Sequence, residues 1–298
     1  MMESYVERFL LSRASSGVAE RTISWYRYQL MLYLDWLPPG AAWDDIETIE
    51  AFLAAEQQRG HKPNTVHARY RSLKAWFGWL HKREIIARSP VANLPAPRLT
   101  QEPVSYVRLV EYERLQGSIE GDDWIAQRDR LILHLLFWCG LRVSELVALR
   151  LEHIDLQAHL LTVQRGKGGK GRVIPCGADV GPLLLSYLMA RPQAPAGVVF
   201  IGSDGAGGYR HELTVAGVAQ MIERRCVHAH MRHLSPHKFR HGYAMAFLNA
   251  GMEMSAVSQT MGHSNQAVTA DFYAKWLTSG LSRQYDETRS RLLNGLTR

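Results

Sequence analysis

The stretch that decides the fold is HKFRH at residues 237–241, which is followed by MGH at 261–263 and by DFY at 271–273. Histidines, an arginine and a tyrosine therefore fall within 37 residues. The intervening residues 242–254 form an apolar run with the spacing of a helix. This combination predicts a cluster of ionisable side chains held by a helical scaffold.

Two further polar segments lie upstream of this stretch. GLRVSEL at residues 140–146 supplies a second arginine and a glutamate, and RGKGGKGR at 165–172 has the glycines of a tight turn. Strand-like runs flank that turn, so it is predicted to be a hairpin. Guanidinium, imidazole, ammonium and phenol groups are together suited to bind a phosphodiester and to attack it without a metal.

Size and composition fit a globular protein of two domains. The chain has 298 residues, of which 46% are hydrophobic and 21% charged, which suffices for two cores. The apolar stretch 131–140 is too short to span a membrane, and the N-terminus lacks the pattern of a signal peptide. Three scattered cysteines do not make a disulfide framework. We expect a cytoplasmic protein with no membrane partner.

The first third of the sequence has a helical pattern. Residues 1–13, 20–37, 45–58 and 64–80 carry apolar side chains at helical spacing, and Asp44 or Asp45 can cap the third of these helices. The fourth helix has one apolar stripe, made of Val66, Tyr70, Leu73, Trp76, Phe77 and Leu80. Residues 1–92 are therefore predicted to form a compact helical domain.

Positive charge is concentrated near the fourth helix. The net charge of the chain is +7, which favours a polyanionic partner. Residues 61–83 contain no carboxylate and six cations, Lys62, Arg69, Arg71, Lys74, Lys82 and Arg83. A solvated helix face is the commoner role of such residues, but the absence of acids favours DNA. We predict that DNA is contacted by Lys62, Arg69, Arg71 and Lys74.

A proline-rich segment separates the two predicted domains. Prolines at positions 90, 95, 97 and 103 resist both helix and sheet, so residues 93–103 are predicted to be a linker. Residues 104–298 form the second domain with a C-terminal tail, and strands are expected at 160–163, 172–174 and 198–201. The whole chain is predicted to be mainly α with a small antiparallel β element.

Two arginines are the candidates for binding the phosphate. Negative charge builds up on the non-bridging oxygens in the transition state, and guanidinium groups bind such oxygens in a bidentate fashion. Arg142 and Arg240 fit this role, although either one alone is more often part of a structural ion pair. Glu145 lies one helical turn beyond Arg142, where its carboxylate could orient a guanidinium or His237.

The glycine-lysine turn supplies further candidates. Lys167 lies at its tip, where the ammonium could protonate the leaving 5′ oxygen. Lys170 could replace it, and Lys170 and Arg172 are predicted to contact DNA. The run is not a phosphate-binding P-loop, because its last glycine is followed by Arg172-Val173 and not by Lys-Ser or Lys-Thr. Taken alone, such a run is more often a surface turn.

Histidine and tyrosine side chains complete the predicted site. His237 and His263 could exchange protons or donate hydrogen bonds to phosphate oxygens near neutral pH. The phenol oxygen of Tyr273 could attack phosphorus and hold it covalently if nearby cations ease its deprotonation. A single histidine or tyrosine is more often structural, so the prediction depends on the whole set.

A group of cysteine and histidine side chains allows a zinc site as an alternative. Its members are Cys226, His228, His230, His233 and His237. Their spacing matches no familiar zinc signature, and His237 already belongs to the stronger pattern. We therefore expect no metal.

The five segments, in this order, resemble the tyrosine recombinase (phage integrase) family. The matching motifs are GLRxxEL, GKGxKxR, HxxRH, GH and a downstream tyrosine; Tyr273 stands ten positions after His263, where nine is the commoner interval. The first domain is similar to the family's helical core-binding (SAM-like) domain, and the second to its catalytic domain. The resemblance implies a nucleophile, Tyr273, and a catalytic cluster of Arg142, Lys167, His237, Arg240 and His263.

The resemblance also implies an activity. A site-specific DNA recombinase of this family cleaves a strand through a 3′-phosphotyrosyl link and exchanges strands through a Holliday junction, with no cofactor. We expect a homotetramer on two double-stranded DNA sites and a monomer or weak dimer off DNA. A type IB topoisomerase and a DNA-binding protein without strand exchange are the alternatives. The short N-terminus fits compact, Xer-like or mobile-element members, and integration, excision, transposition and dimer resolution all stay open.

Overall fold

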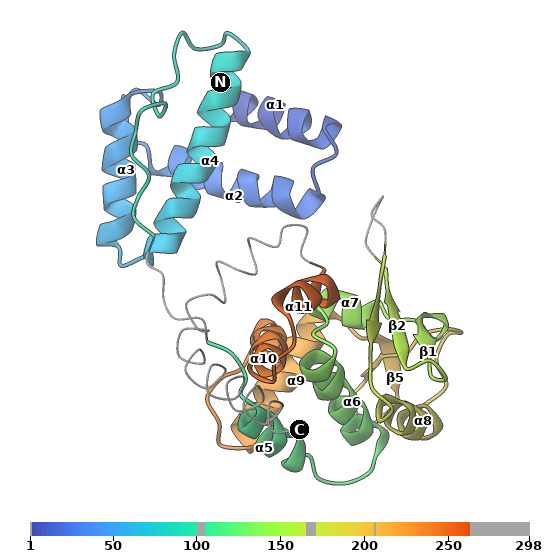
Figure 1. Ribbon diagram of the computed structural model, residues 1–298. Helices are drawn as coiled ribbons and strands as arrows, with labels where there is room; N and C mark the ends of the chain where they lie inside the picture. Colours follow the sequence, from blue (N-terminus) through green and yellow to red (C-terminus); the bar gives the residue numbers. More distant parts are fainter. Residues whose placement is uncertain (1, 100–104, 165–170, 206, 263–298) are drawn as a thin grey trace, which may run out of the picture. The chain divides into compact units, whose positions relative to one another are not determined.

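A computed structural model describes residues 2–99, 105–164, 171–205 and 207–262. The chain divides into two compact units, Met1–Pro103 and Val104–Arg298, each with its own apolar core (Figure 1). No helix in the described ranges combines the length and the apolar character needed to cross a membrane.

Four helices form the described part of the first unit. They are α1 (Met2–Ser15), α2 (Glu20–Trp36), α3 (Ile46–Gln58) and α4 (Pro63–Lys82). Asp45 caps α3 by accepting the backbone N–H of Thr48 at 2.9 Å, which satisfies a donor that the first helical turn leaves free. Helix α4 contacts the other three helices, and all six residues of its predicted apolar stripe are buried. The predicted helices are confirmed.

Arg69 of α4 faces the interior of this unit. Its side chain is only 6% exposed, and Nε donates to Glu56 Oε2 at 3.0 Å. The same guanidinium donates to the side-chain oxygen of Gln29 on α2. The prediction that Arg69 contacts DNA is therefore wrong, because an acid from α3, distant in sequence, binds this cation inside the bundle.

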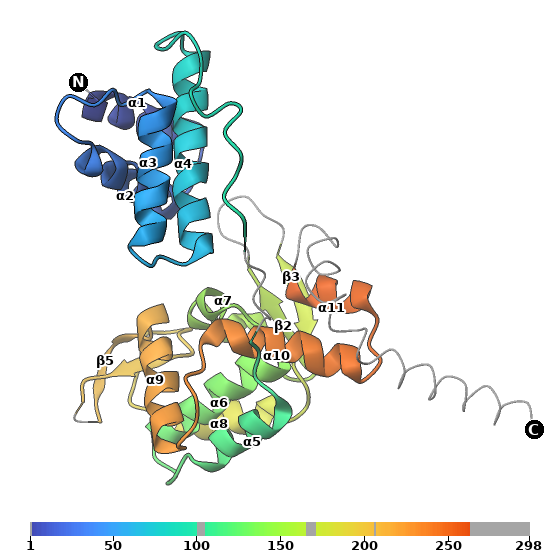
Figure 2. The same cartoon turned by 90° about the vertical axis from the view of Figure 1, so that its left-hand side faces the viewer.

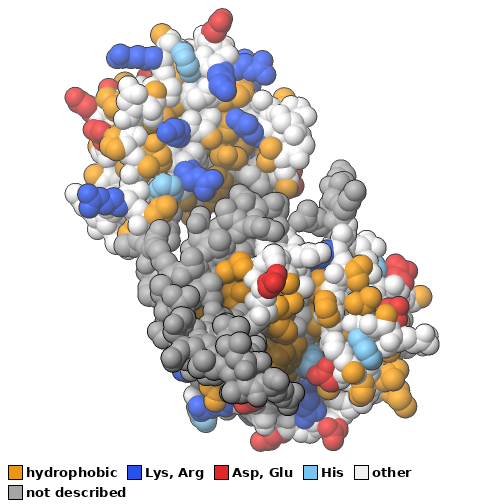
Figure 3. All heavy atoms as spheres, viewed as in Figure 1, with side chains coloured by type: hydrophobic (Ala, Val, Ile, Leu, Met, Phe, Trp, Pro, Cys, Tyr) orange, Lys and Arg blue, Asp and Glu red, His pale blue; other side chains and the backbone are white. Residues whose placement is uncertain are grey.

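Other cations of α4 lie at the surface. Arg71 and Lys74 are exposed, as is Lys62 at the start of the helix. Lys and Arg side chains gather on the face of the first unit that Figure 3 presents. This face keeps the positive charge that the sequence indicates.

The beginning of the proline-rich segment packs against the first unit. Val91 and Leu94 are buried in its core. The Tyr70 hydroxyl donates to Leu94 O at 2.8 Å, and Nδ1 of His67 lies 3.0 Å from Pro97 O. Residues 91–97 are thus held by α4, and the predicted free linker is shorter than 93–103.

Helix α6 (Trp124–Trp138) is the centre of the second unit. It contacts α5, α7, α8 and α10 (Figure 2). The other helices among the described residues of this unit are α5 (Leu109–Gly117), α7 (Val143–Val147), α8 (Val180–Ala190), α9 (Val215–His228), α10 (Pro236–Asn249) and α11 (Met254–Met261). The Asp123 carboxylate caps α6 and the Thr214 hydroxyl caps α9, so both helices begin where a side chain accepts free backbone N–H groups.

The strands form two small antiparallel sheets. After a 3₁₀ turn (Leu151–His153), β1 (Ile154–Asp155), β2 (Leu160–Val163) and β3 (Arg172–Pro175) pair in that order, with Val163 opposite Arg172. The second sheet pairs β4 (Ile201–Ser203) with β5 (Tyr209–Glu212). The predicted strand 198–201 is buried but joins the second sheet only from Ile201. The mainly α fold with small antiparallel sheets is confirmed.

The helical run predicted at 242–254 is divided in two. Helix α10 ends at Asn249, and Gly251 has a φ of +95°, a conformation that glycine adopts without strain. The chain turns there and α11 packs against α10. This reversal returns the end of α11 to the position of Arg240.

Candidate active site

The turn after α6 brings Arg142 and Glu145 together. Gly140 has a φ of +60°, and an added Cβ would lie 2.6 Å from the ring of Tyr243, so this turn requires glycine. Arg142 then immediately precedes α7 as its N-cap residue, and its backbone N–H donates to Glu145 Oε2 at 2.8 Å. The Arg142 Nη1 donates to Oε1 of the same carboxylate, also at 2.8 Å. The structure thus contains the contact that the spacing of the two residues predicts.

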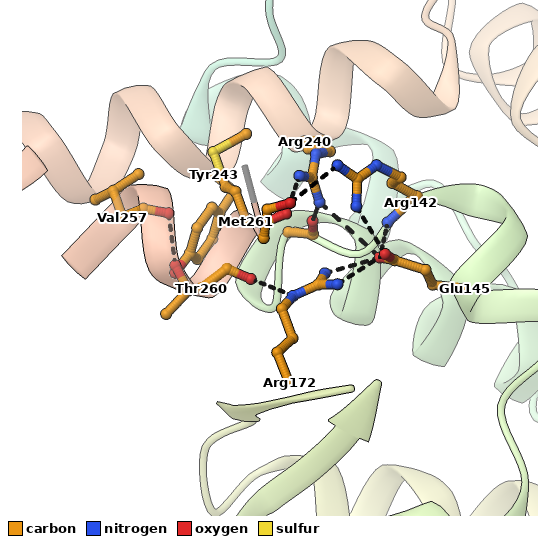
Figure 4. Close-up of polar contacts among 10 residues, drawn as sticks. Arg142, Glu145, Arg172, Arg240, Tyr243, Val257, Thr260 and Met261 are labelled. Carbon is orange, nitrogen blue, oxygen red and sulfur yellow. Dashed lines mark hydrogen bonds and ion pairs between the residues drawn. The ribbon is translucent and has the colours of Figure 1, made fainter. Parts of the chain in front are cut away.

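Arg240 enters the same cluster from α10 (Figure 4). Its side chain is 3% exposed. Nη1 donates to Gly140 O at 2.6 Å, and Nη2 donates to Met261 O at the end of α11. Nη1 also lies 4.0 Å from Glu145 Oε2. Arg240 therefore connects α10 by hydrogen bonds to the turn that carries Arg142 and to the end of α11.

Arg172 is a third guanidinium in this cluster. From the start of β3 it donates two hydrogen bonds to Glu145, at 2.7 and 2.8 Å, and one to Thr260 O at 2.7 Å. Its side chain is 11% exposed. The prediction that Arg172 contacts DNA is wrong, because all three of these nitrogen donors are bound within the protein.

Glu145 is the carboxylate that these arginines share. Its burial works to raise the pKa of the carboxyl, but hydrogen bonds from Arg172 and Arg142 and the charge of Arg172 outweigh burial and lower the pKa to about 2. Glu145 is therefore ionised at neutral pH. One negative charge faces three guanidinium groups, so the described cluster has an excess of positive charge.

His237 lies on α10, one turn before Arg240. Its ring is 4.3 Å from that of His241, edge to face. Desolvation by the surrounding protein, and then the charges of Arg240 and Arg142, lower the pKa of His237 below its ordinary value. His237 is exposed and His241 is buried. The neutral His237 ring is consequently available as both a hydrogen-bond donor and an acceptor.

Four of the predicted site residues lie outside the described residues. They are Lys167, Lys170, His263 and Tyr273. The described residues nearest to them in sequence are Gln164, Gly171 and Gly262. Of these, Gly262 contacts the cluster, because its carbonyl oxygen is 3.5 Å from Arg142 Nη2. Among residues 2–99, 105–164, 171–205 and 207–262, no group of three or more His, Cys, Asp or Glu side chains could hold a metal ion.

The cluster can bind an anion through Arg142. The side chain of Arg142 is 41% exposed, whereas Arg172 and Arg240 are nearly buried. An exposed guanidinium with buried positive charge behind it suits a phosphate oxygen. The sequence did not indicate the role of Arg172 or of the carbonyls of Gly140, Thr260 and Met261. A backbone carbonyl leaves no side-chain signal, and the partner of Arg172 lies in another motif.

Comparison with known proteins defines the class. Residues 106–278 match the phage integrase family. The tyrosine recombinase XerC of Xanthomonas campestris pv. campestris is 30% identical over 97% of this chain and 89% of its own length. The chain belongs to the phage integrase family.

Solved structures show the same fold. The XerH site-specific recombinase bound to a palindromic difH substrate has a TM-score of 0.75 at 17% identity, over 97% of this chain and 95% of that one. The Tn1549 transposon integrase in complex with transposon right end DNA has a TM-score of 0.74 at 20% identity, over 96% and 99%. The predicted class, a tyrosine-type site-specific DNA recombinase, is confirmed, and the topoisomerase and non-catalytic alternatives are not favoured.

Proposed function

We propose that the arginine cluster binds the scissile phosphate of a DNA site while Tyr273 attacks the phosphorus. The observation that carries this proposal is the convergence of Arg142 and Arg240 on Glu145 from two distant segments. The exposed guanidinium of Arg142 and the charge of Arg240 stabilise the negative charge that develops on the non-bridging oxygens. Attack by the phenol oxygen gives a 3′-phosphotyrosyl link and releases a 5′ hydroxyl.

The remaining predicted residues have roles in moving protons. His237 lies beside the two arginines, and its lowered pKa keeps the ring neutral, so that it can accept a proton or donate a hydrogen bond. Lys167 supplies the proton for the leaving 5′ oxygen. His263 donates a hydrogen bond to a phosphate oxygen. The last two roles come from the family resemblance, since both residues lie outside the described ranges.

Strand exchange follows from the same chemistry. The 5′ hydroxyl of a partner duplex attacks the phosphotyrosyl link, so the free tyrosine is restored and one phosphodiester replaces another. No ATP is needed, because the energy of the broken bond is kept in the covalent link. Two rounds of exchange through a Holliday junction use four protomers on two DNA sites. The cytoplasm suits an enzyme that acts on DNA and has three free thiols.

The first unit is proposed to bind the DNA that flanks the cleavage position. Lys62, Arg71 and Lys74 are exposed on or next to α4. Exposed cations that neutralise phosphates release counterions, which makes binding strong at low salt and weak at high salt. Arg69 has no part in this surface.

A nicked suicide substrate tests the proposed function. The nick lets the short strand beyond the cleavage position diffuse away, so the covalent adduct accumulates. We expect the wild-type protein to form an adduct that peptide mapping places on Tyr273. Tyr273→Phe should bind the same DNA and form none. An adduct on another residue, or an adduct of equal yield in Tyr273→Phe, would contradict the assignment.

A further inference from the structure

We propose that Arg172 is a positioning residue for the cleavage step. Its guanidinium holds Glu145, and through it Arg142, in a fixed relation to the end of α11. This inference rests on the proposed function, because it assumes that Arg142 binds the scissile phosphate. Arg172 itself is nearly buried, so it acts through its neighbours and not by contact with DNA.

The hydrogen bonds of Arg172 join three elements. It lies at the start of β3, binds Glu145 of α7 through Nη1 and Nη2, and binds Thr260 O of α11 through Nε. Each element adjoins a proposed catalytic residue in the sequence: β3 follows the segment of Lys167, α7 begins after Arg142, and α11 ends two residues before His263. A single side chain of β3 thus contacts Glu145 of α7 and Thr260 of α11 (Figure 4).

The end of α11 packs directly against the side chain of Arg172. Gly262 has a φ of +63°, and a Cβ at this position would lie 3.0 Å from Arg172 Cδ and 3.1 Å from its Nη1. The glycine therefore serves two purposes, a left-handed helix end and a close approach to Arg172. Arg172 consequently sets where the chain leaves α11, one residue before His263.

Glu145 transmits the position of Arg172 to Arg142. Oε1 of Glu145 accepts from Nη1 of Arg172 at 2.7 Å and from Nη1 of Arg142 at 2.8 Å. Arg172 fixes both carboxylate oxygens, so the carboxylate cannot rotate freely beneath Arg142. Lysine cannot make these contacts, because a single ammonium lacks the planar fork that binds a carboxylate in a bidentate fashion while donating to a third acceptor.

Single-turnover cleavage of the suicide substrate at saturating DNA tests this role. We expect Arg172→Met to cleave about 100-fold more slowly, because small misplacements of catalytic groups cost rates of this order. Arg172→Lys should restore part of the rate at most. The dissociation constant for DNA should stay close to that of the wild type. A wild-type cleavage rate in Arg172→Met would overturn the inference.

Arg225→Met is the matched control. Arg225 of α9 also gives two hydrogen bonds to one carboxylate, from Nε and Nη2 to Asp129 Oδ2 at 2.9 and 2.7 Å. Its loss should lower the melting temperature as the loss of Arg172 does, yet leave single-turnover cleavage unchanged. An equal loss of rate in both variants would show a general structural effect and overturn the inference. If Arg172→Met does not fold, the same comparison is made with Arg172→Lys.

A double variant tests whether Arg172 acts through Glu145. Residues that act as one unit show losses that do not multiply. The loss of rate in Arg172→Met with Glu145→Gln should therefore be smaller than the product of the two single losses, and a full product would overturn the inference. If Arg172→Met cleaves at the wild-type rate while the wild-type protein forms an adduct on Tyr273, only the positioning role of Arg172 is refuted. If the wild-type protein forms no adduct, the proposed function fails and this inference fails with it.

Discussion

Asp129 and Glu145 of the second unit each lie at the centre of a group of arginines, yet the two clusters differ. Around Asp129, Arg128 gives Nε and Nη2 to Oδ1 and Nη1 to Ile201 O, and Arg225 gives Nε and Nη2 to Oδ2. Both guanidinium groups thus face inward. Around Glu145, Arg172 gives Nη1 to Oε1, Nη2 to Oε2 and Nε to Thr260 O, so it is bound within the protein as well. The Arg142 side chain gives one short hydrogen bond to the carboxylate and stays 41% exposed.

The difference separates a structural arginine from a candidate for binding a substrate. A guanidinium has five N–H donors, and a structural arginine directs them to protein acceptors. Arg142 is held in place through Nη1, and part of its guanidinium remains at the surface. Arg240 lies behind it and is 4.0 Å from the shared carboxylate. We therefore propose that the Glu145 cluster receives an anion, whereas the Asp129 cluster stabilises the fold.

The largest expected effect is on the cleavage rate. Arg142→Ala and Arg240→Ala should each slow single-turnover cleavage about 100- to 1,000-fold, as the removal of a donor to a developing oxyanion does. Binding of DNA should be largely retained, because many other phosphate contacts remain. Rates of adduct formation on the suicide substrate measure this effect. A wild-type rate in either variant would remove that arginine from the site.

Removal of the Glu145 carboxylate should destabilise the fold to an extent that depends on pH. Glu145 has a pKa of about 2, so its ionisation stabilises the fold above the unfolded pKa near 4.3, and that share is lost as the pH falls toward 2. Glu145→Gln should therefore lower the free energy of unfolding at pH 7 by about 3 kcal/mol, and the deficit should shrink toward pH 2. Urea unfolding at several pH values measures it.

Glu111 provides the control for this prediction. Burial works to raise the pKa of its carboxyl, but hydrogen bonds from Arg232 and Arg108 lower the pKa to about 2. Glu111→Gln should lose stability with the same pH dependence but cleave at the wild-type rate at saturating DNA. Equal cleavage defects in the two variants would show that stability alone limits the reaction.

A smaller effect is expected on the titration of His237. Desolvation, Arg240 and Arg142 lower its pKa, so NMR should show a midpoint below the ordinary value of about 6.5. Arg142→Gln removes one of the positive charges and should move the midpoint upward. Arg225→Gln should leave it unchanged. A midpoint insensitive to Arg142 would show that the two side chains are not electrostatically coupled.

The smallest expected effect concerns the first unit, where exposed cations again differ from an arginine that is bound within the protein. Arg71→Ala and Lys74→Ala remove exposed cations, so each should lower the slope of log affinity against log salt concentration by about 1. Arg69→Met should lower the melting temperature and keep the wild-type slope, because Arg69 is bound to Glu56 and Gln29. Fluorescence anisotropy at several salt concentrations distinguishes the two results. A changed slope in Arg69→Met would show that Arg69 contacts DNA.

Local sequence signals predicted the elements well and the partners of charged side chains poorly. Asp45 and Thr214 mark helix starts, and the apolar stripe of α4 is the buried face, because caps and periodicity act within a few residues. Arg69 and Arg172 were assigned to DNA because each lies in a basic run. Their acceptors, Glu56 and Glu145, belong to other elements, so only the tertiary structure reveals the pairing. The interruption of the predicted helical run 242–254 at Gly251 likewise depends on one residue within a helical pattern.

Arg142 is proposed to neutralise charge on the scissile phosphate, and a change in the chemistry of the substrate tests this role. A methylphosphonate at the scissile position carries no negative charge on its non-bridging oxygen, so a guanidinium should stabilise its transition state less. The measurement is the ratio of wild-type to Arg142→Ala single-turnover rates on the two substrates. We predict a ratio of about 100 or more on the phosphodiester and a much smaller ratio on the methylphosphonate. The same ratio on both substrates would contradict the account.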